Sequence, residues 1–251
     1  MMKFTFNLRR QELITDAEGH SGWDTRIIQQ AVVVGQTAII ICDMWDNHWS
    51  RGAAERVNAM VPRMNTTLKQ ARRLGTHIIH APSDVIDFYA QHPARQRITT
   101  LSPIAPPEPL EHADPPLPID DKDGGSDTGE TESYHAWTRQ HPGLEIDPER
   151  DVLSDKGAEI YTYLRQHDIQ QVAIMGVHTN MCVLNRSFAI KQMVRWGIQI
   201  ALVRDLTDTM YNPARSPYVS HDEGTQLVIA YIEKFWCPSI ISGDLTTARR
   251  D

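Results

Sequence analysis

The sequence predicts an α/β protein with a doubly wound parallel sheet, and three observations support this class. Short apolar runs alternate with segments of helical periodicity along most of the chain. The runs are rich in β-branched residues and are continuously apolar, as expected for strands covered on both faces. Polar residues that could take part in a reaction follow two of these runs. Parallel sheets place their functional sites at such strand ends.

The first half of the sheet is predicted from two apolar runs and the helix between them. TAIIICDM (37–44), bounded by Gly35, is typical of a buried strand. THIIHAP (76–82) predicts the next strand, which Pro82 ends. Between the strands, apolar residues recur at helical spacing up to a stop at Gly75: Val57, Met60, Val61, Met64 and Leu68.

The second half repeats the alternation. Ile160, Tyr163 and Leu164 indicate a helix, and QVAIMGV (171–177) a strand. The remaining elements are expected as a helix over 183–196, a strand over 198–203, a helix over 221–234 and a strand over 238–242. A right-handed succession of this kind builds a parallel sheet with helices on both faces.

The 251 residues suit one large domain, with two departures from the repeating pattern. Residues 1–36 are interpreted as an N-terminal arm, and 37–251 as the domain. Residues 100–148 form a long insertion, with seven prolines in 103–118 and an acidic stretch behind them. Loops of this length are commonly lids or contact arms. The acidic stretch partly matches a calcium loop, but Ile119 stands at the first ligand position, so a solvated turn is preferred.

Composition narrows the class of partner. The net charge of −7 argues against a nucleic-acid partner, and no apolar stretch is long enough to cross a membrane. The first residues lack the apolar region of a secretory signal, and the three cysteines form no C-x-x-C pair. We therefore expect a cytoplasmic homo-oligomer that acts on a small molecule and needs no cofactor.

Cys182 and Asp43 are the first candidates for chemistry. Cys182 follows the strand 171–177 at the predicted start of a helix, where backbone N–H groups can stabilise a thiolate. Asp43 ends an apolar strand, where burying a carboxylate is costly unless it has a partner or a task. A structural cysteine remains the alternative from spacing alone.

These segments resemble the isochorismatase-like cysteine hydrolases. AIIICDMWDNHW (38–49) is similar to their first strand, an apolar run followed by D-x-Q-x-x-F. GVHTNMCV (176–183) resembles the nucleophile segment G-x-x-T-x-x-C-V of nicotinamidases and N-carbamoyl amidases. Residues 202–208 and 220–242 resemble the later strands and terminal helix, so that the resemblance covers roughly 37–98 and 150–243.

The resemblance implies a three-layer α/β/α fold and a Cys–Asp–Lys triad. Cys182 would be the nucleophile and Asp43 its general base. It also implies a cis peptide at Val177–His178, with the N–H groups of His178 and Cys182 forming an oxyanion hole.

Two features depart from the family pattern. The family lysine lies in K-x-x-Y-S-A-F, and the comparable stretch here is ERDVLSDKGAEI (149–160). Either Lys156 or Arg150 supplies the positive charge, or the third member is absent; arginine could hold a carboxylate but not shuttle a proton. The D-x-H pair that nicotinamidases carry after the second strand is also missing there.

A D-x-H pair follows the first strand instead. Asp46 and His48, with His80, could hold a divalent ion, but we favour His48 as a pocket residue. Further residues near the strand ends are predicted to line the substrate pocket: Trp45, Trp49, Ser83, Tyr89 and Thr179.

The sequence therefore predicts a cysteine hydrolase that cleaves an amide, ureide or similar C–N bond through a thioester acyl-enzyme. One alternative is an isochorismatase-type vinyl-ether hydrolase, against which the presence of Cys182 counts. The other is a catalytically silent binding or scaffold protein on the same fold, which a thiol pKa near or above that of a free cysteine, about 8.5, would favour. The substrate is not specified by the sequence.

Overall fold

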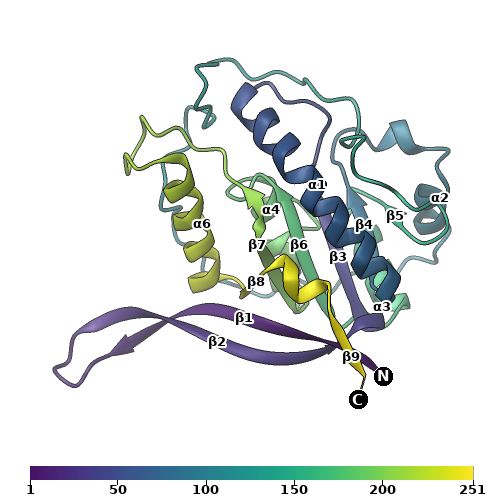
Figure 1. The fold of residues 1–251 in the computed structure, drawn as a ribbon, viewed down its shortest axis with the longest axis horizontal. Coiled ribbons are helices and arrows are strands. Elements are labelled where there is room, and N and C mark those ends of the chain that lie inside the picture. Colours follow the sequence, from purple (N-terminus) through teal and green to yellow (C-terminus); the bar gives the residue numbers. More distant parts are fainter. Residues whose placement is uncertain (251) are drawn as a thin grey trace.

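The computed structural model describes residues 1–250 and contains one nine-stranded sheet with helices on both faces (Figure 1). A central group of strands runs parallel, which confirms the predicted doubly wound fold. In spatial order these strands are β8 (Ser239–Ile240), β7 (Ile200–Asp208), β6 (Gln171–Val177), β3 (Thr37–Cys42), β4 (His77–Ala81) and β5 (Val152–Leu153).

The sheet separates two hydrophobic cores because successive side chains of a strand point to opposite faces. Ile39 and Ile41 pack on the side of α1 (Arg51–Leu74), which ends at Gly75 as predicted. Ile40 and Cys42 face the other core, which contains side chains of several further helices. Among these helices are α3 (Gly157–Gln166), α5 (Ile190–Arg195) and α6 (His221–Phe235).

The helix expected over 183–196 is broken in two. The structure has α4 (Cys182–Asn185) and then α5, with residues 186–189 between them. Ser187 in this break accepts a hydrogen bond from the N–H of Gly157 at 3.0 Å. A Cβ at Gly157 would lie 2.0 Å from the Ser187 carbonyl oxygen, so this close approach of α3 requires glycine. The break therefore anchors the start of α3.

The N-terminal arm contains a long hairpin. β1 (Met2–Thr15) and β2 (Ser21–Val33) pair antiparallel along their whole length. β1 also pairs with β8 and with β9 (Ala248–Arg250), so the hairpin joins the sheet. Its base is buried through Phe4 and Phe6, whereas its outer half reaches past the body of the protein (Figure 1).

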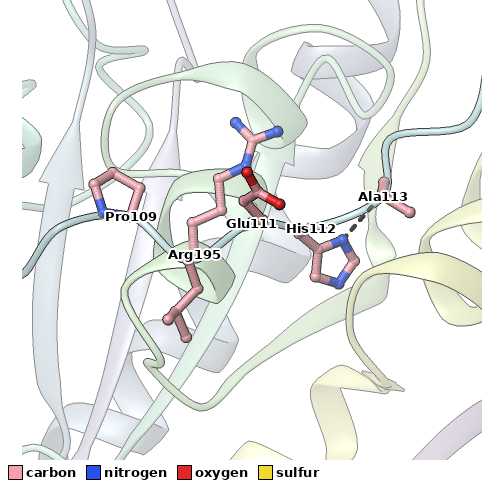
Figure 2. Close-up of a pocket in the computed structure, with 6 residues that line it drawn as sticks. Pro109, Glu111, His112, Ala113 and Arg195 are labelled. Atoms are coloured by element: carbon pink, nitrogen blue, oxygen red, sulfur yellow. Dashed lines mark hydrogen bonds between the residues drawn. The ribbon is translucent and has the colours of Figure 1, made fainter.

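The insertion 100–148 follows the short helices η2 (Ile86–Tyr89) and α2 (Pro93–Thr99). It contacts α3 through Ile104 and Thr162, and it passes α5, where the N–H of Leu110 donates to the carbonyl of Arg195. Residues 109–113 and Arg195 line a surface pocket here, and Figure 2 shows Pro109, Glu111, His112 and Ala113 around it. The chain then returns to β3, where Gln140 forms a β-bridge with Trp45. None of the described helices is long and apolar enough to cross a membrane.

Candidate active site

Asp43 and Cys182 meet where two neighbouring parallel strands end. Asp43 directly follows β3, and Cys182 begins α4 a few residues after β6. The thiol of Cys182 and the carboxylate of Asp43 are close enough for each group to shift the pKa of the other. Asp43 is fully buried, and Cys182 is partly exposed. The fold thus brings together the two residues that sequence analysis singled out.

The Asp43 carboxylate is held by two donors. Oδ1 accepts the backbone N–H of Ser83 at 2.7 Å, and Oδ2 accepts Nε of Arg186 at 2.9 Å. Burial raises the pKa of Asp43, and the Arg186 charge and the hydrogen bonds offset part of that rise. The Asp43 backbone has a φ of 48°, a left-handed conformation that costs a non-glycine residue on the order of 1 kcal/mol or more. These contacts fix the carboxylate against the thiol.

The Cys182 thiol is protonated in this environment. Burial, followed by the negative charge of Asp43, raises the pKa of Cys182 to about 12. The Arg186 charge and a backbone hydrogen bond from His178 act in the opposite direction. The resting pair is therefore a thiol beside a carboxylate that can accept its proton.

Arg186 is the basic residue at this site, which corrects the expectation for Lys156 or Arg150. The side chain of Lys156 is 62% exposed and lies 3.8 Å from Glu159. Arg150 donates to the carbonyl of Arg72, at the far end of α1. Both residues flank β5, which lies at the edge of the sheet and is separated from β6 by two strands. Neither residue is brought to Asp43.

Sequence analysis missed Arg186, although a signal was present. It lies four residues after Cys182, and its N–H donates to the Cys182 carbonyl at 3.0 Å. Residues four apart on a helical turn lie on the same side. A basic residue four positions after the cysteine can therefore reach Asp43, the carboxylate beside the thiol. Arg186 also bridges to Asp84 at 2.9 Å, which ties the loop after β4 to the site.

The peptide bond Val177–His178 is cis, as the resemblance implied. Thr179, however, does not line the pocket. Its hydroxyl lies 2.7 Å from the hydroxyl of Thr207, and its N–H donates to the Asp208 carbonyl. Thr179 is thus fully buried against β7, which corrects its predicted role.

A small pocket lies beside Asp43. It has a cavity volume of about 10 Å³, roughly the space of one water molecule. The residues around it come from the end of β3, the start of α1, the end of β6 and the insertion: Asp43, Trp45, Asp46, Asn47, His48, Ala54, Val57, Asn58, His141, Val177 and His178. Trp45 and His48, two of the candidate pocket residues, thus line this cavity.

Trp137 of the insertion packs on two residues of this pocket. Its ring stacks on Trp45 with the centroids 4.2 Å apart, and on His48 at 5.7 Å. The following residues are anchored to Asp46, whose carboxylate accepts the N–H and the hydroxyl of Thr138 at 2.8 and 2.6 Å. Sequence analysis did not identify Trp137, because nothing local to the insertion shows where it returns to the sheet.

Two histidines at the pocket are neutral. Burial and, to a smaller extent, the neighbouring His48 lower the pKa of His178 to about 3. Burial also lowers the pKa of His48 to about 4. The rings lie 4.9 Å apart, and Nε2 of His178 is buried without a hydrogen-bond partner among the described residues. His48 Nδ1 accepts the N–H of Ser50 at 3.1 Å, so its neutral ring carries the proton on Nε2.

The other predicted pocket residues have structural tasks. The Ser83 backbone holds Asp43, and its carbonyl accepts Nε1 of Trp45 at 3.0 Å. The Tyr89 hydroxyl accepts the N–H of Gln140 at 3.0 Å and so positions the insertion. Trp49 is half-buried and packs closely against Gly124.

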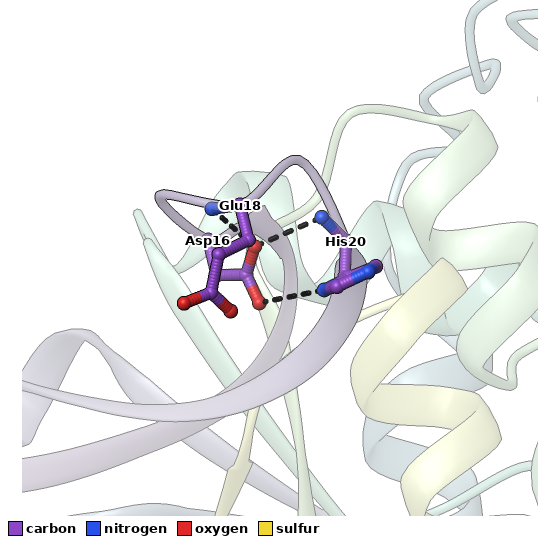
Figure 3. Close-up of side chains that lie close together, drawn as sticks. All are labelled: Asp16, Glu18 and His20. Carbon is purple, nitrogen blue, oxygen red and sulfur yellow. Dashed lines mark hydrogen bonds and ion pairs between the residues drawn. The ribbon is translucent and has the colours of Figure 1, made fainter.

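The candidate metal ligands Asp46, His48 and His80 do not converge. His80 is buried away from the pocket, between Gln140 at 2.9 Å and Asp151 at 3.0 Å. Within residues 1–250, one group of side chains is close enough to share a cation: Asp16, Glu18 and His20. Figure 3 shows this group in the exposed turn of the hairpin, where Asp16 accepts the N–H groups of the other two residues.

The fold and the cysteine–carboxylate pair are those of an α/β cysteine hydrolase. The chain belongs to the isochorismatase domain family, whose model matches residues 37–216. The resemblance noted from the sequence is thereby confirmed, and the protein is an isochorismatase-family hydrolase.

Solved structures agree with this fold. A cysteine hydrolase from Pseudomonas syringae is similar, with a TM-score of 0.53 at 14% identity, covering 86% of this chain and 92% of that one. An isochorismatase from Pseudomonas putida has a TM-score of 0.50 at 14% identity, covering 84% and 91%. At such identity the likeness establishes the fold alone. No curated protein matches the chain.

Proposed function

We propose that this protein hydrolyses an amide, ureide or similar C–N bond of a small molecule, with Cys182 as the nucleophile. The observation that carries the proposal is the position of the Cys182 thiol beside the buried Asp43 carboxylate, where each group shifts the pKa of the other. A thiol needs a base to attack a carbonyl, and this carboxylate is its direct neighbour.

In the proposed reaction, the thiol proton passes to Asp43 as sulfur attacks the carbonyl carbon. The tetrahedral intermediate carries a negative oxygen, which the N–H groups of Cys182 and His178 would stabilise. Asp43 then gives its proton to the leaving nitrogen, the C–N bond breaks, and a thioester remains. Water attacks the thioester after losing a proton to Asp43, and the acid and the free thiol are released.

Arg186 would supply the positive charge that the lysine supplies in a Cys–Asp–Lys triad. Its guanidinium favours the ionised form of Asp43, which is the form that accepts the thiol proton. It stays protonated throughout, because an arginine does not release its proton in proteins. All proton transfers are therefore assigned to Asp43.

The proposal is tested by hydrolysis of a panel of small amides and ureides, with mass spectrometry of the protein during turnover. We expect a covalent acyl adduct on Cys182, and loss of both adduct and turnover in Cys182→Ala. Cys237→Ala is the matched control, since Cys237 is a buried cysteine in the core below α6 and should leave both unchanged. Turnover that persists in Cys182→Ala would overturn the mechanism.

A catalytically silent binding protein is the second candidate, and one observation favours it. The pKa of Cys182 lies well above that of a free thiol, so little thiolate exists at neutral pH. The rate of iodoacetamide labelling as a function of pH distinguishes the two. Labelling that follows an ordinary thiol titration and is unaffected by Asp43→Asn would favour the silent protein, because the carboxylate would then do nothing for the thiol.

A further inference from the structure

The outer edge of the hairpin is long and unprotected. β2 is the edge strand of the sheet, and within residues 1–250 its outer side pairs with no other strand. Its register with β1 runs from Ser21 to Val33 without a shift, so no bulge bends it away. The sequence SGWDTRIIQQAVV has neither proline nor lysine, the residues that commonly block edge pairing. Such an edge is a template for another strand.

The same strand exposes large apolar side chains. Ile27 is 61% exposed, Ile28 58% and Trp23 44%. Trp23 is held on one side by the edge of the Phe235 ring, at 5.8 Å, and by the ammonium group of Lys234, at 4.8 Å. Adjacent residues point to opposite faces, so both faces of the strand carry apolar surface.

The charges of β2 are poorly matched within the hairpin. Asp24 stands directly opposite Glu12, and Arg26 directly opposite Arg10. Like charges in such positions destabilise a pair of strands. Arg26 makes only lateral contacts with carboxylates, to Asp24 at 3.3 Å and to Glu12 at 3.8 Å. A strand that paired with the free edge of β2 could place an opposite charge directly across from Asp24 and from Arg26.

We propose that β2 pairs antiparallel with β2 of a second copy of this chain, about a twofold axis at Thr25. This register sets Asp24 of each copy opposite Arg26 of the other. It also sets Trp23 opposite Ile27, an aromatic and β-branched pair of the kind that stabilises sheets. Moving the axis to Asp24 or to Arg26 would instead oppose two like charges. Charge complementarity therefore selects a single register for a homodimer.

The assembly closes after two copies. A twofold contact uses the same edge of both chains and leaves none of it free. The opposite edge of the sheet is β5, a strand of two residues that offers little to pair with. Two sheets thus become one continuous sheet, and the inference does not depend on the proposed chemistry.

Light scattering after size exclusion of the full chain, with the dissociation constant from sedimentation, tests the proposal. We expect a dimer for the natural chain. Asp24→Arg opposes two arginines at two symmetric positions, and Arg26→Asp opposes two aspartates, so each should weaken the dimer roughly tenfold. The double variant D24R/R26D should restore it. An equimolar mixture of the two single variants should form a heterodimer, because their charges are complementary.

The single variants should leave the fold of the hairpin intact. Asp24→Arg places a positive charge opposite Glu12, and Arg26→Asp places a negative charge opposite Arg10, so circular dichroism should be unchanged. Glu18→Arg makes the same charge change as Asp24→Arg in the exposed turn outside the pairing register, and it should leave the dimer intact. A monomeric natural chain would overturn the proposal. So would a double variant as weak as the single ones, or a mixture that stays monomeric.

Discussion

Arg186 gives this site a charge arrangement that differs from the lysine pattern expected from the sequence. Its guanidinium contacts Asp43 and Asp84 together, from a position one turn after the cysteine. The fork of an arginine can hold two carboxylates at once, whereas an ammonium group is a single point charge. The positive charge and the nucleophile are therefore carried by the same short segment.

Removing the Arg186 charge should change the pH dependence of turnover. In Arg186→Met the pKa of Asp43 rises further, because burial is no longer opposed by the cation. The acidic limb of kcat/KM should then move to higher pH by about 1–3 units. Arg186→Lys should show a smaller displacement, and Lys156→Met, at the exposed residue, none. A profile unchanged in Arg186→Met would show that the residue only packs.

His178 should make the protein sensitive to acid. Its pKa falls from 6.5 to about 3 on folding, so between these values the unfolded chain binds a proton that the folded chain does not. The free energy of unfolding should therefore decrease as pH falls from 6.5 toward 3, by at most about 1.4 kcal/mol per pH unit from this residue. Urea titrations of the natural chain and of His178→Gln check this. The variant should show the shallower decline, and equal slopes would contradict the prediction.

At the scale of elements, residues 137–140 of the insertion pack against the candidate site. Trp137 stacks on Trp45 and His48, and Thr138 donates to Asp46. Gln140 then forms a β-bridge with Trp45. The pocket beside these residues has a volume of only about 10 Å³. These contacts favour the lid among the two roles, lid or contact arm, that the sequence left open.

Shortening the Trp137 side chain should open the pocket. Trp137→Ala removes the stacked ring, so iodoacetamide should label Cys182 faster than in the natural chain. The lost packing of this half-buried ring should cost about 1–2 kcal/mol of folding free energy. Tyr134→Ala is the matched control, since Tyr134 is an exposed aromatic residue of the same segment. Equal labelling rates in both variants would mean that Trp137 does not limit access.

At the scale of the whole molecule, a buried ionic network ties the layers together. Asp151 accepts Nε and Nη2 of Arg72 from α1, at 2.9 and 2.6 Å, and contacts His80 of β4 at 3.0 Å. His80 in turn meets Gln140 of the insertion. Burial would raise the pKa of Asp151, but the bonds from His80 and Arg72 hold it below its usual value. The Asp151 carboxylate thus links α1, the sheet and the insertion.

Breaking this network should destabilise the protein without touching the cysteine. Asp151→Asn leaves the Arg72 charge buried without its partner, which should cost about 3–5 kcal/mol of the free energy of unfolding. Denaturant unfolding measures the loss, and Cys182 labelling well below the transition should be unchanged. Glu149→Gln, at a nearby exposed carboxylate, should stay within about 0.5 kcal/mol of the natural chain. A similarly small loss in Asp151→Asn would show that the network contributes little.

The parallel sheet could be predicted because its strands are covered on both faces and are therefore continuously apolar, as in Thr37–Cys42 and Gln171–Val177. The pairing of Asp43 with Cys182 follows from the same pattern, since both residues lie just past the ends of adjacent strands. The hairpin was missed because its outer half is exposed on both faces and lacks a buried side to reveal its period.

The sequence by itself determined the fold class, the cysteine and the carboxylate, because apolar periodicity and strand ends are local features of the chain. Only the tertiary structure decided which cation serves Asp43, where the insertion returns and which edge of the sheet stays free. Arg186, Trp137 and β2 acquire these roles through contacts between segments far apart in the chain. Such contacts depend on where whole elements pack, and no local pattern of residues records that.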